Sequence, residues 1–280
     1  MKKYDLTVAY RIYPKVSKVP PIFADDKLKL AEFCVYSFKK SLGDLHAKMF
    51  VLLDNCPPEY DDVFFRHFDS DDVEFIRLGG EGNAATFANQ IDLLLTQNDS
   101  EYIYFAEDDY FYLTGEFSEM LDFLKENSNV DFCSPYDHLD YYTSELHRHK
   151  KEEKVFKNRH WHTAGSTCLT FLTTKKVLEE SRKVFETYSR KNSDASLWCI
   201  LTKEKVRNPL TALKFAIKDR ALFKIVVKAW LHGTKHLLTA RKFKLWTPVP
   251  AIATHMEDKY LSPDVNWDEV FKQAKEELHF

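Results

Sequence analysis

The chain has 280 residues, of which 44% are hydrophobic and 30% are charged, and its formal net charge at pH 7 is −3. This composition excludes a disordered chain, and the length suffices for one large domain or two small ones. No run of about 18 apolar residues is present, so the sequence predicts no membrane-spanning helix.

The first half of the chain alternates predicted strands with predicted helices. Apolar runs predict strands at residues 6–10, 49–53, 73–78 and 102–106. Helices are expected between them at residues 28–42, 60–68 and 84–96, the first capped by Asp25 or Asp26 and ended by Gly43. This alternation is typical of an α/β fold in which a mostly parallel sheet carries helices on both faces. Ligands of such sheets bind at the carboxyl ends of the strands.

The second half of the chain is less regular. Its pattern predicts helices at residues 116–126, 175–188, 192–201 and 267–278, and strands at residues 130–133, 166–172 and 248–254. Residues 136–162 show no clear period, and we interpret them as a long functional loop.

The five cysteines are scattered, and none forms a C-x-x-C pair. This usage argues against a zinc site or a disulfide scaffold and favours a reducing compartment. The first five residues lack the apolar stretch of a signal peptide. We therefore expect a cytoplasmic location.

Three adjacent acids, Glu107, Asp108 and Asp109, follow the predicted strand at residues 102–106. Neighbouring carboxylates repel one another and resist burial, so a bound cation would explain the cluster. Mg²⁺ and Mn²⁺ typically bind through one or two carboxylates together with substrate phosphates. The alternative is a solvated turn, since Asp is common where strands end.

Four segments of the chain resemble, in the same order, segments of the GT-A fold glycosyltransferases, especially the bacterial family-2-like enzymes. They are residues 82–90 (GNAATFANQ), 105–110 (FAEDDY), 193–195 (SDA) and 254–256 (THM). The acidic segment has E-D-D where the family pattern is D-x-D. The resemblance implies a Rossmann-like, nucleotide-sugar-binding half at residues 1–135. It implies an acceptor and catalytic half of the same domain at residues 136–202 and 245–280.

By this resemblance, Asp109, His255 and Glu107 would hold Mn²⁺ or Mg²⁺, and Asp108 would lie near the ribose or a metal-bound water. An imidazole ligand suits Mn²⁺ better than Mg²⁺. The alternative for His255 is a surface histidine at the end of a strand.

The donor would be a nucleotide sugar, with a UDP-sugar favoured. The residues that we expect to contact it are Ala9, Tyr10, Arg11, Asp54 and Asn83. Asp54 is equally compatible with an Asx-type turn, and Asn83 with a helix cap. Arg11 would meet phosphate with two hydrogen bonds or pair with an acid on the surface.

An inverting transfer needs a base that takes the proton of the acceptor hydroxyl, and Asp194 is the predicted base. The alternative is a helix N-cap, whose neighbouring amides would lower the pKa of Asp194 and weaken it as a base.

The predicted acceptor-binding residues are Asp137, Trp161, His162 and Gly165. Trp161 would stack on a sugar face, and Gly165 would let the backbone approach a ligand closely. The alternative for Trp161 is a core position beside a turn.

Residues 203–244 form a basic segment with 12 Lys or Arg and two acids, a local charge of +10 against −13 for the remainder. Apolar residues fill the intervals between its cations, and basic amphipathic helices of this kind commonly lie on anionic membranes. We therefore expect a peripheral position on the inner membrane face. The alternatives are a solvated helical pair packed on the core, or an oligomer contact. Nucleic acid is not an expected partner, because the rest of the chain is acidic.

Together these features predict a metal-dependent, inverting glycosyltransferase, for example a hexosyltransferase of polysaccharide biosynthesis, acting on a glycan or a lipid-linked glycan. A sugar nucleotidyltransferase is the first alternative, but it usually needs a glycine-rich phosphate loop after the first strand, and residues 10–14 contain no glycine. The second alternative is a catalytically inactive carbohydrate-binding or scaffold protein on the same fold.

Overall fold

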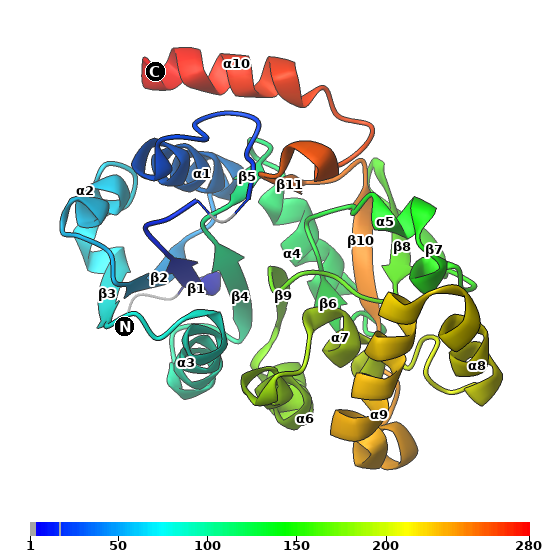
Figure 1. Ribbon diagram of the computed structural model, residues 1–280. Helices are drawn as coiled ribbons and strands as arrows, with labels where there is room; N and C mark the ends of the chain where they lie inside the picture. Colours follow the sequence, from blue (N-terminus) through cyan, green and yellow to red (C-terminus); the bar gives the residue numbers. More distant parts are fainter. Residues whose placement is uncertain (1–3, 17) are drawn as a thin grey trace.

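The structure is a computed structural model that describes residues 4–16 and 18–280. Residues 1–3 lie outside the described residues. They belong to the first five residues, on which the expectation of no signal peptide rests. The fold is built on a nine-stranded sheet with the strand order β3-β2-β1-β4-β9-β6-β10-β8-β7 (Figure 1). A second, two-stranded sheet joins β5 and β11.

Strands β1 to β4 form the parallel half of the large sheet, with β1 hydrogen-bonded between β2 and β4 and with β3 at the edge. Strand β9 runs antiparallel to both β4 and β6, and β10 pairs parallel with β6 and antiparallel with β8. The expected α/β fold with its large central sheet is confirmed. The strands are β1 (Leu6–Ile12), β2 (Ala47–Asp54), β3 (Val73–Leu78), β4 (Tyr102–Glu107), β5 (Tyr110–Tyr112), β6 (Phe132–Cys133), β7 (Glu153–Phe156), β8 (Arg159–Ala164), β9 (Phe171–Thr174), β10 (Leu245–Val249) and β11 (Ala253–His255).

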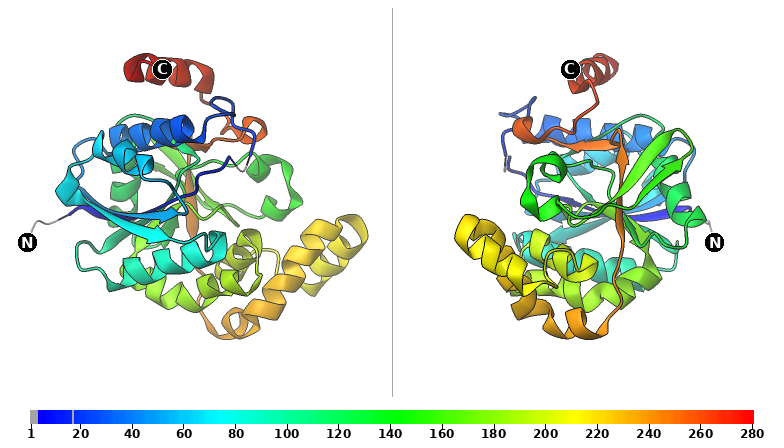
Figure 2. Two further views of the ribbon diagram at one scale, coloured as in Figure 1. Left: turned by 60° about the vertical axis from the view of Figure 1, so that its left-hand side comes forward. Right: turned by 90° about the vertical axis from the view of Figure 1, so that its right-hand side faces the viewer.

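Helices cover both faces of the sheet, as predicted (Figures 1 and 2). One face carries α1 (Lys27–Leu42), α2 (Glu59–Phe65) and α4 (Phe117–Glu126), and the other carries α3 (Asn83–Thr96), α6 (Lys175–Phe185) and α7 (Asp194–Thr202). Helix α10 (Trp267–Leu278) packs on the outside of α1. The remaining helices are α5 (Asp140–Thr143), α8 (Pro209–Lys218) and α9 (Arg220–Thr239), and short 3-10 turns cover Ser70–Asp72, Glu145–His147, Glu186–Arg190 and Asp258–Tyr260.

The two-sided burial of β1 explains why its sequence is apolar throughout. Its side chains alternate between the two faces, so that Val8 and Tyr10 pack under α1 and α2, whereas Ala9 belongs to the core beneath α3. Helix α1 begins at the expected place, because the Asp26 carboxylate accepts a hydrogen bond from the Lys29 N–H (3.0 Å), and it ends at Gly43, whose φ is +55°.

The predicted long loop at residues 136–162 is wrong. This segment forms α5, a 3-10 turn and a β7–β8 hairpin, in which Phe156 pairs with Arg159. The hairpin turn contains Lys157 at a φ of +51°, a conformation that Asn or Gly normally signals in the sequence. Elements of about four residues are too short to show a period, so the pattern could not reveal them.

The other differences concern the ends of strands. β1 runs to Ile12, two residues beyond its predicted end, and β9 begins only at Phe171. The predicted last strand is two strands, because β10 leaves the large sheet at Val249 and β11 then joins β5.

Helix α9 packs so closely on α7 that any side chain at residue 233 would have to displace Ile200. A Cβ atom at Gly233 would lie 2.6 Å from Cγ1 of Ile200, on α7. Alanine would gain at most about 1 kcal/mol of helix propensity, whereas overpacking costs roughly 1–3 kcal/mol. We expect Gly233→Ala to lower the free energy of unfolding in urea by up to about 2 kcal/mol. Gly79→Ala is the control, since a Cβ there meets nothing within 4 Å; an equal loss in both variants would contradict the packing explanation.

Candidate active site

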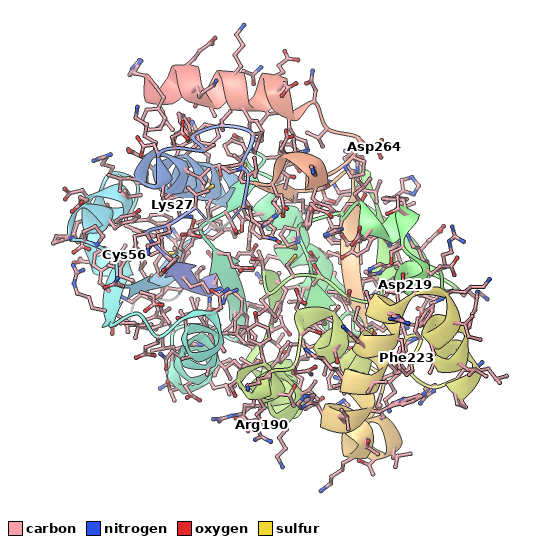
Figure 3. All side chains as sticks on the ribbon, in the orientation of Figure 1. Lys27, Cys56, Arg190, Asp219, Phe223 and Asp264 are labelled. Atoms are coloured by element: carbon pink, nitrogen blue, oxygen red, sulfur yellow. The ribbon has the colours of Figure 1, made fainter. Side chains whose placement is uncertain are left out.

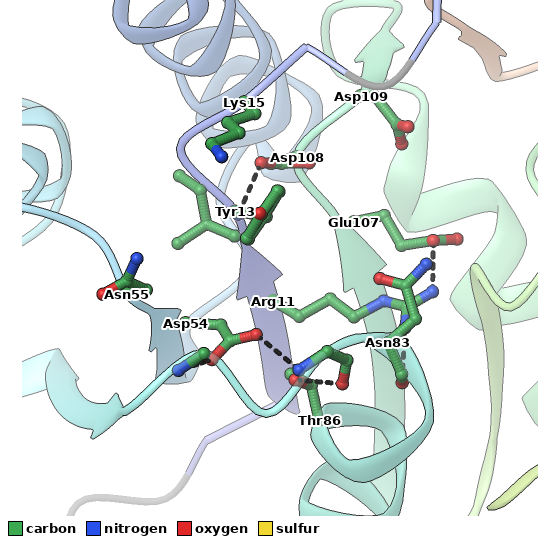
Figure 4. A pocket seen from close by; sticks show the side chains of 13 residues that line it. Arg11, Tyr13, Lys15, Asp54, Asn55, Asn83, Thr86, Glu107, Asp108 and Asp109 are labelled. Atoms are coloured by element: carbon green, nitrogen blue, oxygen red, sulfur yellow. Dashed lines mark hydrogen bonds and ion pairs between the residues drawn. The ribbon is translucent and has the colours of Figure 1, made fainter.

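Two adjoining cavities open at the carboxyl ends of the parallel strands. The first has a volume of about 480 Å³ and the second about 380 Å³, and four residues line both: Arg11, Asn83, Glu107 and Asp109. The other residues of the first cavity are Ile12, Tyr13, Lys15, Asp54, Asn55, Gly80, Gly82, Thr86 and Asp108 (Figure 4). The other residues of the second cavity are Lys18, His138, Asp140, Cys168, Leu169, Tyr188, Asp194, His255, Glu257 and Tyr260.

Glu107 and Arg11 form the wall between the two cavities. Figure 4 shows the Arg11 side chain extending from β1 to Glu107 at the end of β4, where the guanidinium donates to the carboxylate. Thr170 Oγ1 donates to the other oxygen of Glu107 (2.8 Å). The guanidinium also donates to the carbonyl oxygen of Asn83 (3.2 Å), so a hydrogen bond connects the first residue of α3 to Arg11.

Asp108 is held by a cation that the sequence analysis missed. The ammonium group of Lys27 lies 2.8 Å from Asp108 Oδ2, and the Tyr13 N–H donates to the same oxygen (3.0 Å). Burial raises the pKa of Asp108 above its usual value even though Lys27 opposes the shift. The signal in the sequence was the position of Lys27, four residues before the buried Ala31 and therefore on the apolar face of α1.

Asp109 and His255 meet across the small sheet. Pairing of β5 with β11 places His255 opposite Tyr110, so that His255 Nε2 lies 3.1 Å from Asp109 Oδ2 despite a separation of 146 residues. Burial alone would raise the pKa of Asp109, but the adjacent imidazole holds that pKa well below its usual range. Burial in turn lowers the pKa of His255, and Asp109 outweighs it and raises that pKa.

Two of the three residues predicted to bind a metal ion, Asp109 and His255, lie in contact with each other. Among the described residues, no group of three or more His, Cys, Asp and Glu side chains is arranged to hold a metal ion. Asp109 and His255 offer two donor groups, and Asp109 Oδ1 is buried without a hydrogen-bond partner. Such a pair fits an ion that takes its other ligands from phosphates and water. Glu107 does not join them as a third ligand, because Arg11 and Thr170 occupy both of its oxygens.

Asp54 organises the loop that closes the first cavity. Its two carboxylate oxygens accept hydrogen bonds from the backbone N–H groups of Gly80, Glu81 and Gly82, at 2.8 to 2.9 Å. Gly80 and Gly82 have φ values of +90° and +80°, which only glycine adopts without strain. The carboxylate therefore shapes this loop, and a direct contact of Asp54 with the donor stays a prediction.

Ala9 and Tyr10 line neither cavity, although we predicted them to contact the donor. The carbonyl oxygen of Ala9 accepts a hydrogen bond from Gln90 (2.7 Å), and the Tyr10 ring packs edge-on against Phe64. The reason is the extra length of β1, which places Arg11 and Ile12 at the edge of the sheet and leaves Ala9 and Tyr10 in the core.

Asp194 lines the second cavity as the first residue of α7. Ser193 is the N-cap residue, and Asp194 Oδ1 accepts a hydrogen bond from the N–H of Ala195 (2.7 Å). The lowered pKa that the N-cap alternative implied does not occur, because burial raises the pKa of Asp194 more than this N–H lowers it. A raised pKa makes the carboxylate a stronger base than an ordinary Asp.

The four predicted acceptor residues lie outside both cavities. Trp161 is fully buried and stacks on Phe123 with ring centroids 4.0 Å apart, because β8 is an inner strand of the sheet. His162 Nε2 lies 3.5 Å from Asp137 Oδ1 in a buried contact. A Cβ atom at Gly165 would lie 3.4 Å from the His149 ring and 3.5 Å from Cβ of Glu204, so Gly165 is packed against these two side chains.

Besides His255, the aromatic rings that line the second cavity are those of His138, Tyr188 and Tyr260. His138 lies in an irregular segment, and Tyr188 and Tyr260 belong to 3-10 turns. Burial lowers the pKa of His138, so its imidazole is neutral near pH 7.

The chain matches no protein-family model and no curated protein sequence. Solved structures show distant likenesses. The galactosyltransferase LgtC, in complex with donor and acceptor sugar analogues, aligns with 97% of this chain and 95% of its own, with a TM-score of 0.47 and 10% identity. The glycosyltransferase GlyE of Streptococcus pneumoniae aligns with 98% of this chain and 60% of its own, with a TM-score of 0.44 and 14% identity. A cytidylyltransferase of Leptospira borgpetersenii aligns with 63% of this chain and 62% of its own, with a TM-score of 0.36 and 12% identity. Likenesses at this level establish neither a family nor an activity for this chain.

Proposed function

We propose that the protein is a glycosyltransferase that moves a sugar from a nucleotide-diphosphate donor to a hydroxyl group of a glycan or lipid-linked glycan. The observation that carries this proposal is the pair of adjoining cavities that share the wall of Arg11, Asn83, Glu107 and Asp109. A transfer between two substrates needs two neighbouring compartments whose contents meet at one point.

The first cavity suits the donor. Helix α3 begins at its wall, and no side chain caps the first N–H groups of the helix, which are a favourable site for phosphate. Lys15 adds an exposed cation, and Arg11 adds a buried one at the junction with the second cavity. A divalent ion held by Asp109 and His255 would supply Lewis-acid stabilisation of the negative charge on the departing diphosphate.

The second cavity suits the acceptor. Asp194 would take the proton of the acceptor hydroxyl while the hydroxyl oxygen forms its bond to the anomeric carbon of the donor sugar. The bond between that carbon and the β-phosphate oxygen breaks, and the nucleoside diphosphate leaves with the electron pair. Attack from the face opposite the leaving group would invert the anomeric configuration.

The lining of the second cavity also indicates the kind of acceptor. Glu107 pairs with Arg11, and Glu257 lies 3.4 Å from Lys18, whereas Asp140 and Asp194 form no ion pair with a Lys or Arg among the described residues. Two carboxylates without cations favour a neutral, hydroxyl-rich acceptor and disfavour an acidic one.

The experiment is a titration calorimetry panel of UDP, GDP and dTDP with and without Mn²⁺, followed by assays of diphosphate release from the matching nucleotide sugar. We expect metal-dependent binding of one nucleotide and slow release that neutral glycosides accelerate. Absence of binding for all three nucleotides would favour an inactive scaffold. Pyrophosphate release from a nucleoside triphosphate and a sugar phosphate would favour a nucleotidyltransferase.

A further inference from the structure

The α8–α9 hairpin projects from the body of the fold and is attached to it along one side (Figure 2). Helix α9 buries Leu222, Val226, Ala229 and Gly233, which pack in the core together with α7. Helix α8 buries only Ala212 and Phe215. The opposite sides of both helices face solvent.

The solvent side of α8 carries an apolar stripe. Leu210, Leu213 and Ile217 are between 60% and 80% exposed, and their spacings of three and four residues place them on one face of the helix. Lys214 and Lys218 follow the stripe along one edge, one residue after Leu213 and Ile217. Exposed aliphatic side chains that occur singly need no explanation, but three in register on one helix indicate a contact surface.

Helix α9 carries a second pair of exposed aliphatic side chains with a neighbouring lysine. Leu231 and Leu238 are more than three-quarters exposed and lie seven residues apart, on one side of the helix. Lys235 lies on that same side, between the two leucines.

The cations of the hairpin are largely uncompensated. Residues 209–239 contain six Lys or Arg, and Asp219 is their single acid. Asp219 lies at the corner between the two helices (Figure 3), where its carboxylate caps α9 by accepting the N–H groups of Ala221 and Leu222. In the part of the chain that the structure describes, Lys218, Arg220, Lys224 and Lys235 form no ion pair.

We propose that the α8–α9 face, defined by Leu210, Leu213, Ile217, Leu231 and Leu238 with their neighbouring lysines, docks on the surface of a bilayer that contains anionic lipids. The aliphatic side chains would enter the boundary between headgroups and acyl chains, and the lysines would meet lipid phosphates. Within the described residues no helix is both long and apolar enough to cross a bilayer, so the contact is peripheral.

Two other partners fit this face less well. Nucleic acid would use the cations but would leave the aliphatic stripe in water. A second copy of the same face would bring like charges together, which opposes association. Of these three partners, only the bilayer uses both the aliphatic stripe and the uncompensated lysines.

The test is co-sedimentation of the full chain with vesicles of phosphatidylcholine alone and of phosphatidylcholine mixed with phosphatidylglycerol. We expect about 10-fold or more tighter binding to the anionic vesicles, weakening as the salt concentration rises. Ile217→Glu should lose most of this binding. Val155→Glu is the matched control, because Val155 is also an exposed aliphatic residue (69%) but lies on β7.

Equal binding to both kinds of vesicle, no binding to either, or an equal loss in the Val155→Glu control would overturn the proposal. A wild-type chain that elutes as a dimer, and that Ile217→Glu converts to a monomer, would assign the face to self-association instead. Both substitutions are on exposed positions, so unchanged thermal unfolding checks that the variants fold. The binding assay contains no sugar nucleotide, so its result does not depend on the proposed function.

Discussion

Asp194→Asn is expected to lower kcat for sugar transfer by about 10²- to 10⁴-fold, the usual contribution of a positioned general base. Asparagine keeps the size of the side chain and can still accept the N–H of Ala195, but it cannot take a proton from the acceptor hydroxyl. The dissociation constant of the nucleotide should stay unchanged, since Asp194 lines the second cavity and not the first.

The stability of the same variant separates a catalytic role from a structural one. Burial raises the pKa of Asp194 in the folded chain, so the folded state binds the proton more tightly than the unfolded state does. Above that raised pKa, the ionised carboxylate therefore lowers the free energy of unfolding. This loss of stability disappears as the pH falls through the raised pKa. A neutral asparagine avoids this loss, and the melting temperature at pH 7 should be equal to or higher than that of the wild type.

The pH profile of kcat/KM completes this prediction. Transfer should rise as the pH increases through the raised pKa of Asp194. The acidic limb of the profile should therefore lie at a higher pH than the value near 4 that an ordinary Asp would give. Asp140→Asn is the control, because Asp140 lines the same cavity and should affect the KM for the acceptor more than kcat. Normal turnover by Asp194→Asn would remove this residue from the mechanism.

The parallel half of the sheet was predictable because β1, β2 and β4 are buried on both faces. A continuous apolar run such as β4 is typical of a strand buried inside a parallel sheet. The acids that follow such a run then lie at the carboxyl ends of the strands. The place of the acid cluster and of Arg11 at the carboxyl ends of the strands followed from this rule, and the choice of Asp194 followed from the family resemblance.

The contacts among these residues were not predictable, because they depend on tertiary pairing. Strands β5 and β11 have three residues each, too few for a pattern, yet their pairing decides that His255 meets Asp109. The sequence also cannot show that Arg11 forms an ion pair with Glu107. Because of this ion pair, Glu107 belongs to the wall between the cavities, whereas we expected it to bind the metal ion. Trp161 is an error of another kind. Its neighbours, histidines and a glycine, suggested a surface that binds a ligand, but Trp161 lies in the core.

Asp109→Asn and His255→Gln are each expected to weaken Mn²⁺ binding at least about 10- to 100-fold, in the range seen when the immediate surroundings of a metal site are altered. The side chains of Asp109 and His255 are in contact, and Asp109 Oδ1 is buried and accepts no hydrogen bond. After either substitution, the proposed ion would keep one protein ligand and be held mainly by phosphates and water, so the affinity for metal should fall more than the affinity for the nucleotide alone.

The measurement is an electron paramagnetic resonance titration of free Mn²⁺ with and without the nucleotide, which reports binding independently of turnover. Chelation of metal should abolish transfer by the wild type, and higher Mn²⁺ should partly restore transfer in His255→Gln, since Gln retains an oxygen ligand. His160→Gln is the matched control, because His160 is an exposed histidine on β8 that lines neither cavity. Unaltered Mn²⁺ binding in both site variants, with transfer lost, would show that Asp109 and His255 act through their contact with each other and not through a metal ion.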